Sequence, residues 1–183
     1  MADLLTYNSA KIEHSNDYSD DTYVAIMYLA PAKLSGKNFC AWASPGCILA
    51  CLNTAGRAAI FPPIAIARKK RSDLFNNNRR AFKAQLIKEI AAHVRRAQRK
   101  GLRPAVRLNG TSDLLWERIF PDIFDTFPEV QFYDYTKYPQ RFRNNLPNNY
   151  HLTFSLSERD DSEREALAWL ESGGNVAIVF DTR

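Results

Sequence analysis

The run Tyr23-Val24-Ala25-Ile26-Met27-Tyr28-Leu29 is continuously apolar and has the length of one β-strand. A strand without polar alternation is typical of a parallel sheet that is buried on both faces. Pro31 follows two residues later, and proline ends a central strand because it cannot donate to the hydrogen-bond ladder. We therefore place the first strand of a parallel sheet at 23–29.

Further segments of strand length alternate with helical patterns in the second half of the chain. These segments cover 105–108, 130–135, 151–156 and 176–180. Between them, Ser112 is a candidate N-cap for a helix toward Phe124, a short polar helix lies near 140–145, and Ser162 is a candidate N-cap for a helix that ends at Gly173. This alternation predicts parallel β–α units with right-handed crossovers.

The chain has 183 residues, whereas a closed eight-fold barrel takes about 250 residues. The expected fold class is therefore α/β, as a partial (β/α) barrel. It has a curved, mostly parallel sheet of about five to six strands with helices outside. We expect residues 1–22 to form a polar N-terminal arm and residues 23–183 to form the domain. Because the chain stops just after a strand, that strand would be an open edge, so we expect either that something covers it or that the natural protein continues.

A long basic helix is predicted between Asn78, a candidate N-cap, and Gly101, a candidate C-terminal cap. The stretch 68–103 holds thirteen Lys and Arg and two acidic residues, so its own net charge is about +11. The whole chain has a net charge of +5, so the rest of the chain is near −6. Such a cluster is either a solvated helix face or a surface for nucleic acid. The candidate nucleic-acid residues are Arg68, Lys69, Lys70, Arg71, Arg79, Arg80, Arg95 and Arg96.

No apolar run approaches the roughly 20 residues that a membrane-spanning helix needs. The N-terminus also lacks the basic and apolar regions of a signal peptide. We expect a cytoplasmic protein without membrane contact, whose thiols are kept reduced.

All three cysteines, Cys40, Cys47 and Cys51, fall in one Gly-, Pro- and Ser-rich segment over 32–63, with the spacing C-x6-C-x3-C. A connection of this length is typical of a functional segment. The interpretation favoured by this clustering is a metal or iron–sulfur site, and the alternative is a set of small apolar core residues. Structural zinc takes four ligands, so it would need a histidine from His14, His93 or His151. A cluster held by three thiolates leaves one iron open.

Polar side chains also follow the other strands of the series. Because the carboxyl ends of parallel strands meet at one edge, where barrel enzymes bind their ligands, we expect them to form a rim around the cysteine segment. The candidate cofactor-binding residues are Asn109, Thr111, Ser112, Asp113, Tyr135, Lys137 and Ser155. The polar residues Asp181, Thr182 and Arg183 follow the last strand.

Four stretches of the chain resemble phage proteins of the gene product 88 type: 44–57, 106–113, 132–137 and 175–180. The resemblance runs over most of the chain from about residue 23. Three cysteines after the first strand of a partial barrel also resemble the radical S-adenosylmethionine (radical SAM) superfamily, although its usual motif is C-x3-C-x2-C. Host-cell cytoplasm is the location that the phage resemblance implies.

The radical SAM resemblance implies that Cys40, Cys47 and Cys51 hold a [4Fe–4S] cluster, whose open iron binds S-adenosylmethionine. The substrate is unknown. One alternative is a non-catalytic nucleic-acid-binding protein, with a structural metal such as zinc beside the basic helix. Another is a degenerate barrel with free cysteines that acts through protein contacts.

Overall fold

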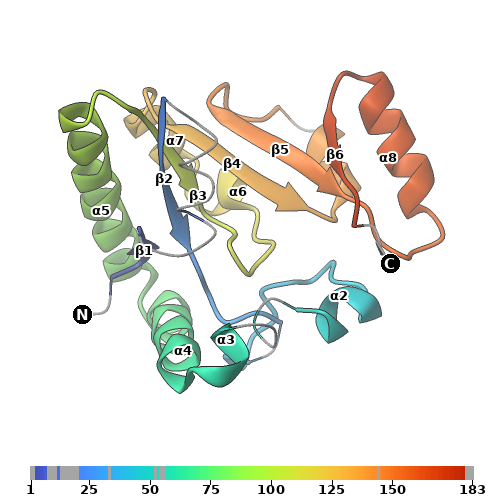
Figure 1. Cartoon of the computed structure of the whole chain (residues 1–183), viewed down its shortest axis with the longest axis horizontal. Helices are drawn as coiled ribbons and strands as arrows, with labels where there is room; N and C mark the ends of the chain where they lie inside the picture. Colours follow the sequence, from blue (N-terminus) through green and yellow to red (C-terminus); the bar gives the residue numbers. More distant parts are fainter. Residues whose placement is uncertain are drawn as a thin grey trace.

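A computed structural model describes residues 3–7, 12, 21–32, 34–51, 53, 57–143 and 145–179. These residues form one six-stranded sheet with helices packed on it (Figure 1). The strands lie in chain order, β1 to β6. Their bounds are β1 Leu5–Thr6, β2 Thr22–Met27, β3 Arg103–Arg107, β4 Gln131–Thr136, β5 Tyr150–Ser155 and β6 Asn175–Ala177.

Strands β2 to β6 pair in parallel, and β1 adds to β2 in the antiparallel direction. The prediction of an α/β fold with a mostly parallel sheet is confirmed, and the partial barrel stays a prediction. The expected first strand is also confirmed, since β2 occupies 22–27 and its last four residues are buried. The residues Asp181, Thr182 and Arg183 lie outside the described part of the chain.

The expected polar arm, residues 1–22, contains buried apolar residues that its overall polar composition does not lead one to expect. Leu4, Leu5 and Ile12 are buried. The backbone N–H groups of Leu4 and Leu5 donate to the carboxylate of Glu89 at 2.8–3.0 Å. The domain boundary at residue 22 stays a prediction, but β1 belongs to the sheet.

The helices are α2 Pro45–Leu49, α3 Arg57–Ile60, α4 Pro62–Asn77, α5 Arg79–Arg99, α6 Trp116–Ile119, α7 Asp122–Thr126, the 3₁₀ helix η1 Pro139–Arg143, and α8 Ser162–Glu171. The predicted basic helix is α5, and Asn78 caps it by accepting from the Ala81 N–H at 3.0 Å. Gly101 closes it with a φ of 68°, which favours glycine. Helix α4 was not predicted.

Two predicted helix caps are wrong. No helix begins at Ser112, because its hydroxyl donates to the Asn109 side chain at 2.8 Å and the chain instead forms the short helices α6 and α7. Ser162 is the first residue of α8 rather than its cap. Its hydroxyl accepts from the Ser157 N–H at 2.9 Å. Both serines fix loops instead of starting helices.

The sheet has a helix-covered face and a second, more open face. Phe75, Phe82 and Trp116 join Val106 and Phe132 in the main core under the helices. On the second face, Ile12 packs with Val24, Ile26 and Ala105. Farther along this face, Tyr135, His151 and Asn175 are exposed. Among the described residues, no helix is long and apolar enough to cross a membrane.

Candidate functional site

The cysteine segment lies beyond the arrowheads of the parallel strands, where Figure 1 shows α2 and α3 below the sheet. It leaves the sheet after β2, as predicted. Cys40 contacts the stretch that follows β3, because its thiol donates to the Thr111 carbonyl oxygen at 3.6 Å. The same sulfur accepts from the Ala32 N–H at 3.5 Å. The segment is therefore anchored at the carboxyl end of the sheet.

The three thiols differ in their surroundings. Cys40 is half-buried, and burial raises its pKa to about 11. Cys47 is exposed in the first turn of α2; burial of part of its surface raises its pKa, and the Lys137 ammonium opposes that shift. Cys51 is half-buried and accepts from the Asn53 N–H at 3.5 Å. Cys51 and Cys47 both act on the pKa of Cys40, so the thiols share one neighbourhood.

The thiols do not converge in this conformation. In the part of the chain that the structure describes, no three His, Cys, Asp or Glu side chains are arranged to hold a metal ion. The donor types nevertheless fit an iron–sulfur cluster or zinc, both of which take cysteine thiolates. Ligation by all three cysteines stays a prediction.

Glu158 joins the cysteine segment to the loop between β5 and α8. Its carboxylate accepts from the Ser44 hydroxyl at 2.7 Å and from the Gly46 N–H at 2.6 Å. Hydrogen bonds from its own N–H, Ser44 and Gly46 lower the pKa of Glu158. Ser44 also accepts from the Cys47 N–H at 3.2 Å, so this contact fixes the turn that carries Cys47.

The stretch after β3 is occupied by internal contacts. Asn109 accepts from the Ser112 hydroxyl, the Leu114 N–H and the Trp116 indole N–H at 2.8–3.0 Å. The Thr111 hydroxyl donates to the Leu29 carbonyl at 2.5 Å. A Cβ on Gly110 would lie 2.6 Å from the Met27 carbonyl oxygen. The contacts of Gly110 and Thr111 join the stretch after β3 to the end of β2. The buried polar groups of this stretch are hydrogen-bonded within the protein.

Asp113 belongs to a buried network centred on Arg141, which is fully buried. The Arg141 guanidinium donates to both carboxylate oxygens of Glu117 at 2.8 and 3.1 Å, to Asp113 at 3.1 Å and to the Tyr150 hydroxyl at 2.8 Å. Tyr150 in turn donates to Asp134 at 2.7 Å. Burial raises the pKa of Asp113 and Arg141 opposes it. The network ties the stretch after β3 to the interior of β4, to the start of β5 and to η1.

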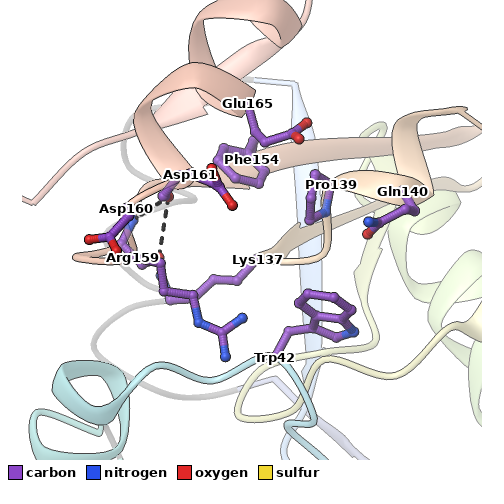
Figure 2. A pocket seen from close by; sticks show the side chains of 11 residues that line it. Trp42, Lys137, Pro139, Gln140, Phe154, Arg159, Asp160, Asp161 and Glu165 are labelled. Carbon is purple, nitrogen blue, oxygen red and sulfur yellow. Dashed lines mark hydrogen bonds between the residues drawn. The ribbon is translucent and has the colours of Figure 1, made fainter.

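Lys137 and Ser155 are brought together, since the Lys137 ammonium donates to the Ser155 hydroxyl at 2.8 Å. Lys137 also lines a cavity of about 510 Å³. Figure 2 shows Trp42 on the cysteine-segment side of this cavity and Asp161 and Glu165 on the α8 side. Tyr135 is not among the cavity residues and lies on the second face of the sheet.

The basic residues predicted to bind nucleic acid divide into two groups. Arg68 is buried and donates to the Asn53 side chain at 2.6 Å. Arg71 is half-buried and donates to the Asp3 carbonyl at 2.6 Å. These two arginines hold the fold together, which the charge pattern could not reveal. The exposed residues are Lys69, Lys70, Arg79, Arg80, Arg95 and Arg96.

Of the histidines considered for zinc, the two that the structure describes, His93 and His151, do not join the cysteines. His93 is fully buried on α5, with Nε2 at 3.0 and 3.1 Å from the carbonyl oxygens of Tyr23 and Ala105. His151 lies on β5 and contacts Asn175. His14 is outside the described residues.

Sequence reasoning missed two side chains that shape this end of the molecule: Trp42 and Arg141. Trp42 stacks on Tyr138 with ring centroids 4.4 Å apart, and its position among the cysteines was an available signal. Arg141 stands in a polar stretch in which nothing distinguishes it from solvated residues.

Comparison with known proteins places the chain in a family. No curated protein and no solved structure matches it significantly. A family model described as gene product 88 matches residues 3–183, which is nearly the whole chain. The stretches 106–113 and 132–137, which carry the resemblance, also supply most of the buried contacts described above. The chain therefore belongs to the gene product 88 family.

Proposed function

We propose that this member of the family is an iron–sulfur protein of radical SAM type, with Cys40, Cys47 and Cys51 as ligands of a [4Fe–4S] cluster. The observation that carries the proposal is the placement of the cysteines. All three belong to one segment at the carboxyl end of the parallel strands, and they lie close enough to influence the ionisation of Cys40.

The chain's own residues support such a site. The Ala32 N–H and the Thr111 carbonyl fix the sulfur of Cys40. The Glu158 carboxylate fixes the first turn of α2 and therefore the backbone of Cys47. The Lys137 ammonium favours the thiolate form of Cys47. When bound, the cluster and S-adenosylmethionine would supply one-electron chemistry that removes hydrogen from a substrate. The cavity lined by Trp42 and Lys137 is beside this segment and is open to such a substrate.

Anaerobic reconstitution tests this proposal. The full chain, treated with iron and sulfide, should hold about four of each per molecule and show a brown absorbance band. Reduction should give an electron paramagnetic resonance signal that changes when S-adenosylmethionine is added. Replacing Cys40, Cys47 or Cys51 by serine should abolish the band, whereas Ala41→Ser, an exposed change in the same segment, should retain it. Zinc alone, or no metal in the reconstituted wild type, would contradict the proposal.

A second candidate function is nucleic-acid binding through the basic segment. Its support is the set of exposed cations on α4 and α5, of which Lys70, Arg80 and Arg95 have no acidic partner within ion-pair distance in the described structure. Structural zinc on the cysteines would accompany this function.

Salt dependence measures this second function. A fluorescent single-stranded DNA should bind weakly, and the logarithm of its affinity should fall with the logarithm of salt with a slope of about 0.7 per phosphate that the protein neutralises. Neutralising Lys69, Lys70, Arg95 and Arg96 to glutamine should lower both affinity and slope. Arg159→Gln and Arg164→Gln, exposed arginines elsewhere, serve as controls. An equal loss of affinity in the two control variants, or no DNA binding at low salt, would show that the basic segment is only a solvated face.

A further inference from the structure

Two arginines are nine-tenths or more buried near the carboxyl ends of β3 to β5, and they differ in their partners. Arg141 makes four hydrogen bonds to Glu117, Asp113 and Tyr150. Arg107 is 7% exposed, yet no hydrogen bond joins its guanidinium to an acceptor among the described residues. Its Nε is sealed from solvent without a partner. Because a guanidinium carries five donors in a fixed fork, Arg107 keeps unused donor capacity.

The carboxylate nearest to Arg107 does not satisfy it. The Asp134 oxygen lies 3.9 Å from the Arg107 Nε, which is beyond hydrogen-bond distance. Asp134 already accepts from the Asn109 N–H at 2.7 Å, from the Asn109 amide at 3.2 Å and from the Tyr150 hydroxyl at 2.7 Å. The two groups attract each other, but Asp134 is committed to the network centred on Arg141.

Arg107 is surrounded by side chains of the second face of the sheet. It pairs in register with Ile26 on β2, and the adjoining register of β3 with β4 brings it beside Tyr133. Its guanidinium carbon lies 4.6 Å from the ring centroid of Tyr135, whose ring is 37% exposed. Thr153, opposite Tyr135 on β5, is half-exposed.

Arg107, Tyr133 and Tyr135 together have the chemistry of an anion-binding site. Arg107 is a fixed positive charge with unused donors. Burial raises the pKa of Tyr133 to about 12, so its hydroxyl stays protonated at neutral pH and available to donate. The exposed Tyr135 ring adds an aromatic surface beside the charge. Asp134, the acidic side chain closest to the guanidinium, has its oxygens occupied.

We infer that Arg107, Tyr133 and Tyr135 form a binding site for a small oxyanion, a phosphate or carboxylate group, on the second face of the sheet. The guanidinium contacts the anion, the Tyr133 hydroxyl donates to it, and the Tyr135 ring contacts the organic part of the molecule. This site needs neither the cysteines nor a metal, so it stands or falls independently of the proposed cluster.

Calorimetric titration of the full, metal-free chain tests the site with three probes: inorganic pyrophosphate, adenosine monophosphate and succinate, at constant ionic strength. At least one probe should bind the wild type. Tighter binding of pyrophosphate or adenosine monophosphate identifies a phosphate ligand, and tighter binding of succinate identifies a carboxylate ligand. Tighter binding of adenosine monophosphate than of pyrophosphate would assign the organic contact to the Tyr135 ring. Absence of binding by all three overturns the inference.

Substitutions then locate the binding. Arg107→Met should weaken the affinity at least tenfold, and Arg107→Lys, which keeps the charge but not the fork, should weaken it less. Arg103→Met is the matched control, because it removes the same charge from an exposed arginine of the same strand and should change the affinity less than twofold. Equal weakening by Arg103→Met and Arg107→Met would show nonspecific charge attraction and overturn the site. If circular dichroism shows that Arg107→Met does not fold, unchanged affinity of Arg107→Lys overturns it instead.

Discussion

Replacing Arg141 by methionine is expected to lower the free energy of unfolding by about 3–5 kcal/mol, the range observed when one partner of a buried ion pair is removed. The physical reason lies in what stays behind. Asp113 and Glu117 lose three hydrogen bonds from Arg141 and would remain nearly buried without a compensating charge. Urea unfolding followed by circular dichroism measures the loss.

Two further variants test the reason given for this loss of stability. Arg164→Met should change the free energy of unfolding by no more than about 0.5 kcal/mol, because Arg164 is 73% exposed and its ion pair with Asp161 is a surface pair. Adding Glu117→Gln to Arg141→Met should recover part of the loss, since one unpaired charge disappears. A loss in Arg141→Met as small as that in Arg164→Met would mean that the network contributes nothing to stability.

His93 should lower the free energy of unfolding by roughly 3 kcal/mol as the pH falls from about 6.5 to 4. Burial lowers the pKa of His93 from 6.5 to about 4. In this window the unfolded chain binds a proton at His93 and the folded chain does not. The free energy of unfolding therefore drops by about 1.4 kcal/mol per pH unit from this residue alone. Above pH 6.5 both states are neutral at His93, and its contribution is constant.

Comparison with His93→Gln isolates this contribution from buried carboxyl groups that act in the opposite direction. Burial raises the pKa of Asp134 to about 6, so the folded chain binds that proton first and Asp134 adds stability as the pH falls. Between pH 6.5 and 4, the pH slope of the wild type should exceed that of the variant by about one proton, in the direction of lost stability at lower pH. His151→Gln is the control, because His151 is exposed. A wild-type slope that matches the His93→Gln slope would mean that His93 titrates normally in the folded state.

The strands of the sheet could be predicted because the residue pattern that marks a strand is local in the sequence. A continuous apolar run such as 23–29 needs burial on both faces, and this holds whatever the rest of the chain does. The long helix α5 was predictable for the same reason, from its repeating apolar residues and Asn78. Helix α4 was missed although Pro62 and Pro63 are a recognised start signal. Its strongly basic composition conceals the few residues, among them Ser72 and Phe75, that face the core.

The site was predictable in position but not in detail. The parallel direction of the strands alone brings the cysteine segment and the polar residues after β3, β4 and β5 to one edge. Which of these polar groups are used internally depends on partners distant in sequence. Asp113 is held by Arg141 and Thr136, and Thr111 by Leu29. No local pattern marks a polar residue as already satisfied, so structural and ligand-binding groups looked alike.

The agreement between strand order and chain order has a consequence for how the protein folds as it leaves the ribosome. Each of β4, β5 and β6 meets an existing neighbour on the strand made just before it. Synthesis can therefore extend the sheet one unit at a time from the N-terminus, and the pairs that involve β4 to β6 have low sequence separation, which favours rapid folding. We expect the closure of β2 onto β3 across helices α2 to α5 to be the slowest of these pairings, because the longest connection carries the largest loop entropy.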